Sequence, residues 1–185
     1  MPEPARDPAS EPVPDPAPEK PLASDAEFRA HLDRAIVLAR EAATIGEVPV
    51  GAVVYETATG KPLGEGANRR EIDADPAAHA ELIAIRQAAR AHGDWRLNRC
   101  TLVVTLEPCP MCAGLIVNAR LGRVVFSTWD PKAGACGSVL STLDQPKLNH
   151  RPEVIVPDET NADLLRTQEC SAMLKDFFRS LRRRS

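Results

Sequence analysis

Two short motifs in this chain carry residues that can bind a metal ion and move protons. The first is His79-Ala-Glu81, and the second is Cys109-Pro-Met-Cys112, whose first cysteine lies 30 residues after the histidine. If Pro110 begins a helix, two cysteines three positions apart turn their sulfurs toward one point. The positive end of the helix dipole also favours the thiolates that metals bind. We therefore predict that His79, Cys109 and Cys112 bind one metal ion.

Zinc suits these ligands best, and the incomplete ligand set indicates catalysis. Two thiolates and one imidazole supply three corners of tetrahedral Zn²⁺, and no equally good fourth ligand stands at a matching position. Three ligands plus water or hydroxide form a catalytic site, in which zinc lowers the pKa of the water to about 7. Glu81 is a poor fourth ligand but can reach such a water, so we predict that it carries protons.

Each motif alone has a simpler interpretation. A Cys-x-x-Cys pair is as typical of redox chemistry as of metal binding, and a lone histidine or glutamate on a helix is usually packed or solvated. Together, His-x-Glu and a later Pro-Cys-x-x-Cys form the signature of zinc-dependent nucleobase deaminases. The alternative from another class is a non-catalytic zinc or redox module, in which a further protein ligand would close the metal site.

The elements around these motifs predict an α/β fold. Apolar periodicity and turn residues predict a helix from Asp25, strands at 50–55 and 63–67, a helix at 76–92, a strand at 101–106, a helix at 110–120, strands at 123–127 and 154–156, and a last helix at 161–182. Strand and helix alternate after the first hairpin. That order predicts a three-layer α/β/α sandwich with a mixed five-stranded sheet, whose ligands bind beyond the strand ends.

Composition indicates one globular domain with a tail. The 185 residues are 43% hydrophobic and 26% charged, which suits a protein with a buried core. Residues 1–24 are rich in proline, alanine and acids, so we expect a disordered tail followed by a domain at 25–185. No apolar run approaches the roughly 20 residues of a membrane-spanning helix, and no secretion signal is visible, so we expect a cytoplasmic protein.

The remaining cysteines and the basic residues leave questions open. We predict that Cys100 and Cys170 are core thiols, whereas a metal or redox role stays open for Cys136. The net charge is −3, and the last seven residues hold four arginines, which permits a nucleic-acid partner without requiring one. Basic residues that could gather on one face are Arg69, Arg70, Arg120, Arg123, Lys132, Lys147, Arg151 and the terminal arginines.

The chain resembles the cytidine deaminase-like superfamily and, within it, is similar to the bacterial tRNA-specific adenosine deaminases. The resemblance extends from about Phe28 to Arg182. Besides the two motifs, it rests on Gly46-Glu-Val-Pro-Val-Gly-Ala52, Gly64-Glu-Gly-Ala-Asn-Arg69, Asp130-Pro-Lys-Ala-Gly-Ala135, Leu148-Asn-His-Arg151 and Phe177-Phe-Arg179. The chain departs from the family at Ala67, where an aromatic residue often precedes the asparagine, at Pro157–Ala162, and in the tail.

The resemblance implies hydrolysis of adenosine to inosine at the wobble position of an arginine-accepting tRNA. A homodimer would act on a flipped-out nucleotide of the anticodon loop, with zinc-bound hydroxide as nucleophile and Glu81 as proton shuttle. It also implies that Asn68 contacts the nucleoside, that Val50 and Phe178 line the pocket, and that Asp130, Lys132 and Asn149 touch RNA. The nearest alternative is a zinc-dependent deaminase of a free base or nucleotide, such as guanine or cytosine, which would need a closed pocket.

Overall fold

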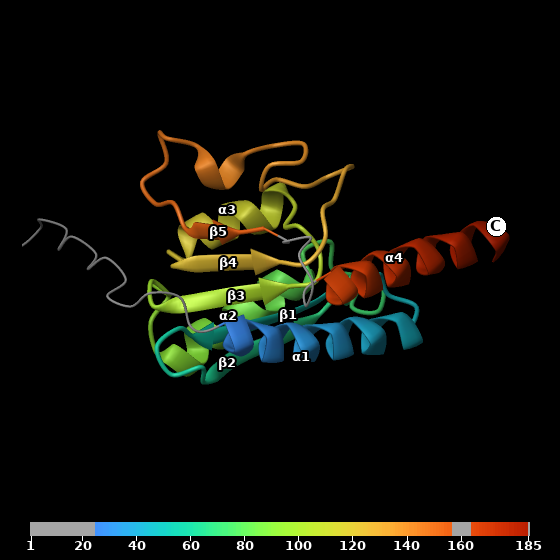
Figure 1. The fold of residues 1–185 in the computed structure, drawn as a ribbon, viewed down its shortest axis with the longest axis horizontal. Coiled ribbons are helices and arrows are strands. Elements are labelled where there is room, and N and C mark those ends of the chain that lie inside the picture. The colour runs from blue at the N-terminus through green and yellow to red at the C-terminus, as the bar shows by residue number, and fades with distance from the viewer. Residues whose placement is uncertain (1–24, 157–163, 185) are drawn as a thin grey trace, which may run out of the picture.

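The computed structural model describes residues 25–156 and 164–184, so the predicted tail at 1–24 lies outside the described residues. Its elements are α1 (Asp25–Thr44), β1 (Gly51–Glu56), β2 (Pro62–Ala67), α2 (Ala80–His92), β3 (Cys100–Val104), α3 (Pro110–Asn118), β4 (Arg123–Phe126), the short 3₁₀ helix η2 (Thr142–Asp144), β5 (Glu153–Ile155) and α4 (Leu164–Arg184). The sheet has the order β2-β1-β3-β4-β5 (Figure 1). The β1–β2 and β1–β3 pairs are antiparallel and the β3–β4 and β4–β5 pairs are parallel, so the predicted mixed five-stranded sheet is confirmed.

Helices cover both faces of the sheet. Successive side chains of a strand point to opposite faces, so neighbouring residues of one strand pack against different helices. Val54, Leu102 and Val104 pack in one cluster with apolar residues of α2 and α3. Val103 and its neighbour Val125 pack in another cluster with apolar residues of α1 and α4. The helices therefore form two layers around the sheet, and the predicted three-layer α/β/α sandwich is confirmed.

Glycines in β2 bring α2 unusually close to the sheet. A Cβ atom at Gly66 would lie 2.2 Å from the backbone oxygen of Ala80, and one at Gly64 would lie 2.2 Å from that of Ala84. Only glycine permits this approach, because any side chain would displace the helix backbone. The start of α2, where Glu81 lies, is thereby held against the edge of the sheet.

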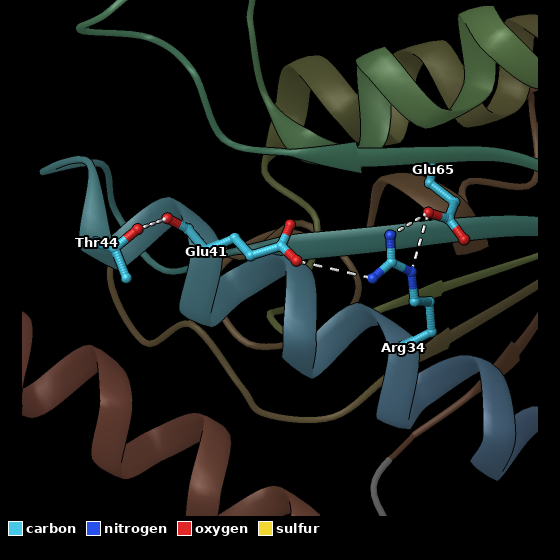
Figure 2. A network of polar contacts seen from close by, with 4 residues as sticks. All are labelled: Arg34, Glu41, Thr44 and Glu65. Atoms are coloured by element: carbon cyan, nitrogen blue, oxygen red, sulfur yellow. Dashed lines mark hydrogen bonds and ion pairs between the residues drawn. The ribbon is translucent and has the colours of Figure 1, made fainter.

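The outer helices are also tied by exposed ion pairs. Arg34 of α1 pairs with Glu65 of β2 at 2.7 Å and with Glu41 at 3.8 Å, and the Thr44 hydroxyl donates to the backbone oxygen of Glu41 (Figure 2). Arg166 of α4 likewise pairs with the Asp33 carboxylate of α1, at 2.6 Å. Exposed pairs contribute about 0–1 kcal/mol each, so apolar packing sets the positions of these helices.

The structure moves several predicted boundaries. The second helix was predicted from Pro76 but begins at Ala80, because residues 75–78 form a turn in which the Asp75 carboxylate accepts the Ala77 N–H. The predicted strand at 101–106 ends at Val104. The predicted start of the last helix at Asn161 and the variant segment Pro157–Ala162 lie outside the described residues. None of the helices at 25–156 and 164–184 has the length and apolar character needed to cross a membrane.

Candidate active site

The predicted metal ligands come together at the starts of two helices. His79 is the N-cap of α2 and Cys109 the N-cap of α3, while Cys112 lies in the first turn of α3. The His79 Nδ1 atom is 3.6 Å from the Sγ atom of each cysteine, and the three ligand atoms all lie within 4.8 Å of one another. Neither helix start uses a capping side chain, so these side chains are available to a ligand.

The donor set fits zinc in both geometry and charge. Zinc bonds of about 2.3 Å to sulfur and 2.0 Å to nitrogen, at tetrahedral angles, separate the ligand atoms by about 3.5 Å, close to the spacing seen here. Hydrogen bonds from Cys112 and His79 lower the pKa of the Cys109 thiol to about 4, whereas the neighbouring Cys109 sulfur and burial raise that of Cys112. Two adjacent thiolates are stable together only around a cation, as a divalent metal would provide.

Glu81 lies directly beside this cluster in the first turn of α2. Its side chain is only 4% exposed, and burial raises the pKa of its carboxyl to about 6, with nearby Cys109 adding to the effect and His79 opposing it. A carboxyl group with such a pKa can take up and release a proton near neutral pH. The position therefore suits a proton carrier beside a metal site.

One pocket joins the cluster to most of the predicted substrate residues. It has a volume of about 840 Å³, within the usual range for small-molecule sites, and lies beyond the carboxyl ends of β3 and β4. His79, Glu81 and Cys109 line it, as do the predicted contacts Val50, Asn68, Asp130, Lys132 and Phe178. The side of α4 that faces it contributes Phe178 and three basic residues, and Figure 1 shows this helix running outward from the sheet.

Asn149 is the predicted substrate residue that the structure does not bring to this pocket. Arg120, which precedes β4, donates to the backbone oxygen of Asn149 at 2.9 Å. Asn149 therefore lies near the amino end of β4, whereas the pocket lies beyond its carboxyl end. An RNA contact by Asn149 would require a different surface of the protein.

Only some of the basic residues that could have gathered on one face lie at the pocket. Arg70, Lys132, Lys175, Arg179 and Arg182 line the pocket. Arg69 instead pairs with Asp73 at 2.8 Å, and Arg123 is buried in an ion pair with Glu153. The cationic lining thus comes from three separate segments of the chain, and α4 supplies most of it.

Two buried carboxylates shape the pocket, and the sequence analysis assigned neither a role. Glu47 is fully buried and accepts hydrogen bonds from the Asn68 side-chain amide, at 2.9 Å, and from the backbone N–H groups of Glu71 and Ile72, both at 2.8 Å. The hydrogen bond between the two side chains directs the Asn68 amide nitrogen toward Glu47. The amide oxygen therefore remains as the group that can accept a hydrogen bond from a ligand.

The second carboxylate, Glu107, organises the loop after β4. It is 2% exposed and accepts backbone hydrogen bonds from Asp130 at 3.0 Å, Cys136 at 2.8 Å and Ser138 at 3.1 Å. A Cβ atom at Gly134 would lie 2.1 Å from the Glu107 carboxylate, so glycine is needed for the loop to close around it. Glu47 stands inside the Gly46–Ala52 motif and Glu107 stands two residues before Cys109, each beside an apolar residue and a proline, and that context is the signal that could have indicated burial.

The remaining cysteines and Ala67 lie outside the site. Cys100 and Cys170 are buried free thiols, as predicted, and burial raises their pKa values to about 12 and about 11. Burial, with Glu107 close by, also raises the pKa of Cys136 to about 12. The metal-ligand group found in the described part of the chain consists of His79, Cys109 and Cys112 and does not include this thiol. Ala67 packs toward α1, away from the pocket.

A solved structure shares both the fold and much of the sequence. It comes from work described as biochemical and structural studies of A-to-I editing by tRNA:A34 deaminases at the wobble position of transfer RNA. The TM-score is 0.71 at 37% identity, over 79% of this chain and 99% of that one. The sandwich and its His, Cys and Cys cluster thus define a cytidine deaminase-like protein, as the motifs predicted, and proteins of this class depend on zinc.

Sequence comparisons define the family more narrowly. The model of the MafB19-like deaminases matches residues 27–182, and the chain belongs to this family. The tRNA-specific adenosine deaminase of Bacillus subtilis (strain 168) is 42% identical over 154 residues, which are 83% of this chain and 90% of the relative. That of Haemophilus influenzae is 45% identical over 148 residues, 80% of this chain and 81% of the relative. The family resemblance based on the motifs is therefore confirmed.

Proposed function

We propose that this protein hydrolyses adenosine to inosine at the wobble position of a tRNA, with Glu81 as the proton carrier. One observation carries the proposal: a single pocket joins the His79, Cys109 and Cys112 cluster and Glu81 to a cationic lining from α4. Its relatives are named tRNA-specific adenosine deaminases. A polyanionic substrate needs such cations, because phosphate contacts supply much of the affinity for RNA.

The reaction converts adenosine and water to inosine and ammonia. His79, Cys109 and Cys112 would hold Zn²⁺, which supplies the Lewis acidity that makes water a nucleophile at neutral pH. The oxygen of the water attacks carbon 6 of adenine while Glu81 takes the first proton of that water. Glu81 then passes this proton to the ring nitrogen next to carbon 6. It then carries the second proton to the amino group, which leaves as ammonia when the carbon–nitrogen bond breaks.

The pocket residues would hold one extruded nucleoside. Enzymes that act on a base remove it from the stack and bind it in a pocket, and the volume of about 840 Å³ accommodates an adenosine nucleotide. Val50 and Phe178 would contact the base, and Asn68, oriented by Glu47, would accept a hydrogen bond through its amide oxygen. Asp130 and Lys132, in the loop that Glu107 organises, would contact the adjoining RNA backbone.

A homodimer and an arginine-accepting tRNA are the finer parts of the proposal. Met111 of α3 and the nearby loop residues Val139 and Leu140 are exposed apolar residues. A Cβ atom at Gly114 of α3 would meet nothing within 4 Å, so this helix face has room for a second copy. The oligomeric state is measured by sedimentation at several protein concentrations, and Leu140→Asp should shift it toward monomer. A tRNA substrate would place the protein in the cytoplasm.

The test compares substrates of different size. The zinc-loaded protein is incubated with an anticodon stem-loop carrying a wobble adenosine, and separately with free adenosine, guanine and cytosine, and the products are identified by mass. We expect inosine in the stem-loop and no change in the free compounds. Deamination of a free compound alone would support the alternative substrate class, and no reaction with any compound would support the non-catalytic zinc module. Stem-loops from other tRNAs then test the choice of the arginine acceptor.

A further inference from the structure

Trp129 is a large aromatic residue that lines the pocket and has no role in the function proposed above. It lies in the loop after β4, immediately before Asp130, and 43% of its surface is exposed. The ring is nevertheless held in place. It packs edge-to-face against Phe126, with centroids 4.8 Å apart and planes at 77°, and an added Cβ at Gly137 would lie 3.4 Å from it.

This combination of a fixed ring and an exposed surface suits stacking. Phe126 is buried in the core cluster, so the contact anchors one edge of the indole to the sheet. Trp129 lines the pocket, where Lys132 and Arg70 supply positive charge. Aromatic side chains beside cations are the usual means by which proteins bind single-stranded nucleic acid, because every base has a flat face that can stack.

The target adenine must reach the groups that react with it, at the starts of α2 and α3. Glu81 and Cys109 belong to the helix starts, whereas Trp129 belongs to the loop that also carries Asp130 and Lys132. On the basis of the proposed function, we infer that Trp129 stacks on the base of a nucleotide next to the target adenosine. This contact holds the anticodon loop open while the target base occupies the pocket. Stacking requires a base at that position but tolerates any of the four.

Binding is tested by fluorescence, because the chain has two tryptophans. The other, Trp95, is exposed in the segment between α2 and β3 and packs against Arg96, so Trp95→Phe leaves Trp129 as the only indole. Glu81→Gln in the same protein slows turnover during the titration. We expect the anticodon stem-loop to quench this emission and a duplex RNA of equal length to leave it unchanged. Emission that shifts with protein concentration in the absence of RNA would instead assign the ring to an interface between copies, and would overturn the inference.

Activity gives the second test. We expect Trp129→Ala to raise the KM for the stem-loop roughly 5- to 150-fold, with kcat changed little, and Trp129→Phe to retain most of the affinity. Trp95→Ala is the matched control and should leave KM unchanged. Wild-type KM in Trp129→Ala would overturn the inference while leaving the proposed function intact. A wild-type protein that deaminates no stem-loop would overturn the proposed function itself.

A third test changes the RNA and leaves Trp129 in place. Stem-loops are made with an abasic residue on one side or the other of the wobble adenosine, and the wild-type protein is assayed on each. Loss of the stacked base should raise KM about as much as Trp129→Ala does. Trp129→Ala assayed on the abasic stem-loop should raise KM no more than either change alone, because both changes remove the same contact. Fully additive effects would show that the ring and the base do not touch, and would reject the inference.

Discussion

The floor and the rim of the pocket are built in different ways. We define the floor as His79, Glu81 and Cys109, which lie on the starts of α2 and α3. We define the rim as Trp129, Lys132, Phe178, Arg179 and Arg182, which lie on one loop and on α4. The floor rests on helices packed against the sheet, whereas Trp129 and Phe178 are each more than 40% exposed.

This difference separates reaction from recognition. Burial raises the pKa of Glu81, and hydrogen bonds from Cys112 and His79 lower that of Cys109, so changes in the floor should act on kcat. The rim contributes exposed aromatic and cationic groups, whose contacts should act mainly on KM. The following predictions test this division, from the largest expected effect to the smallest.

Removing a metal ligand should have the largest effect. We expect Cys109→Ala to lose both bound zinc and detectable deamination, because two remaining ligands hold the ion poorly. Metal content is measured by inductively coupled plasma mass spectrometry. Cys136→Ala is the matched control, since this neighbouring thiol is outside the cluster. Equal zinc loss in both variants would contradict the ligand assignment.

Removing the proton carrier should separate chemistry from metal binding. We expect Glu81→Gln to lower kcat by roughly 10²- to 10⁴-fold, because the amide cannot exchange protons but has nearly the same shape. Zinc content and the KM for the stem-loop should change little. Wild-type kcat in a zinc-loaded Glu81→Gln protein would reject the proton-carrier role and leave the ligand assignment intact.

Glu107 connects floor and rim, so its substitution tests whether the two are independent. Glu107→Gln replaces a carboxylate that accepts three backbone hydrogen bonds, and its amide nitrogen would face N–H donors. We expect a loss of about 2–3 kcal/mol in the free energy of unfolding in urea, together with a higher KM. Glu65→Gln, on the exposed side of β2, should cost less than about 1 kcal/mol.

The smallest effects should come from single rim cations. We expect Arg179→Ala to raise KM a few-fold and to reduce the salt dependence of stem-loop binding by about one phosphate contact, with kcat unchanged. Arg86, exposed on α2 outside the pocket lining, is the matched control. A large fall in kcat in Arg179→Ala would show that rim and floor are not separable.

The sequence predicted which residues come together in the floor, because they belong to two compact motifs at helix starts. The alternation of strand and helix also predicted the sandwich, since apolar periodicity determines which face of each element is buried. The boundary at Pro76 was wrong because a proline is equally compatible with a turn, and here the Asp75 carboxylate stabilises one.

The rim was harder to predict because part of it lies in a loop without periodicity. Asn149 and Asp130 belong to the same long connection between β4 and β5, yet they lie at opposite ends of β4. Trp129 shows no spacing that distinguishes an exposed ring from a core residue. The burial of Glu47 and Glu107 was not predicted, because acidic residues are rarely buried unless paired. Their partners here are mainly backbone N–H groups, whose positions a sequence does not give.

The most direct test of the central claim follows the oxygen of the water. The zinc-loaded protein is incubated with the anticodon stem-loop in ¹⁸O-labelled water, beside the Glu81→Gln variant, and the wobble nucleoside is analysed by mass spectrometry. Hydrolytic deamination predicts inosine that carries one ¹⁸O atom with the wild-type protein, and far less product with the variant. A wobble adenosine left unchanged by the wild-type protein, or inosine without the label, would contradict the account.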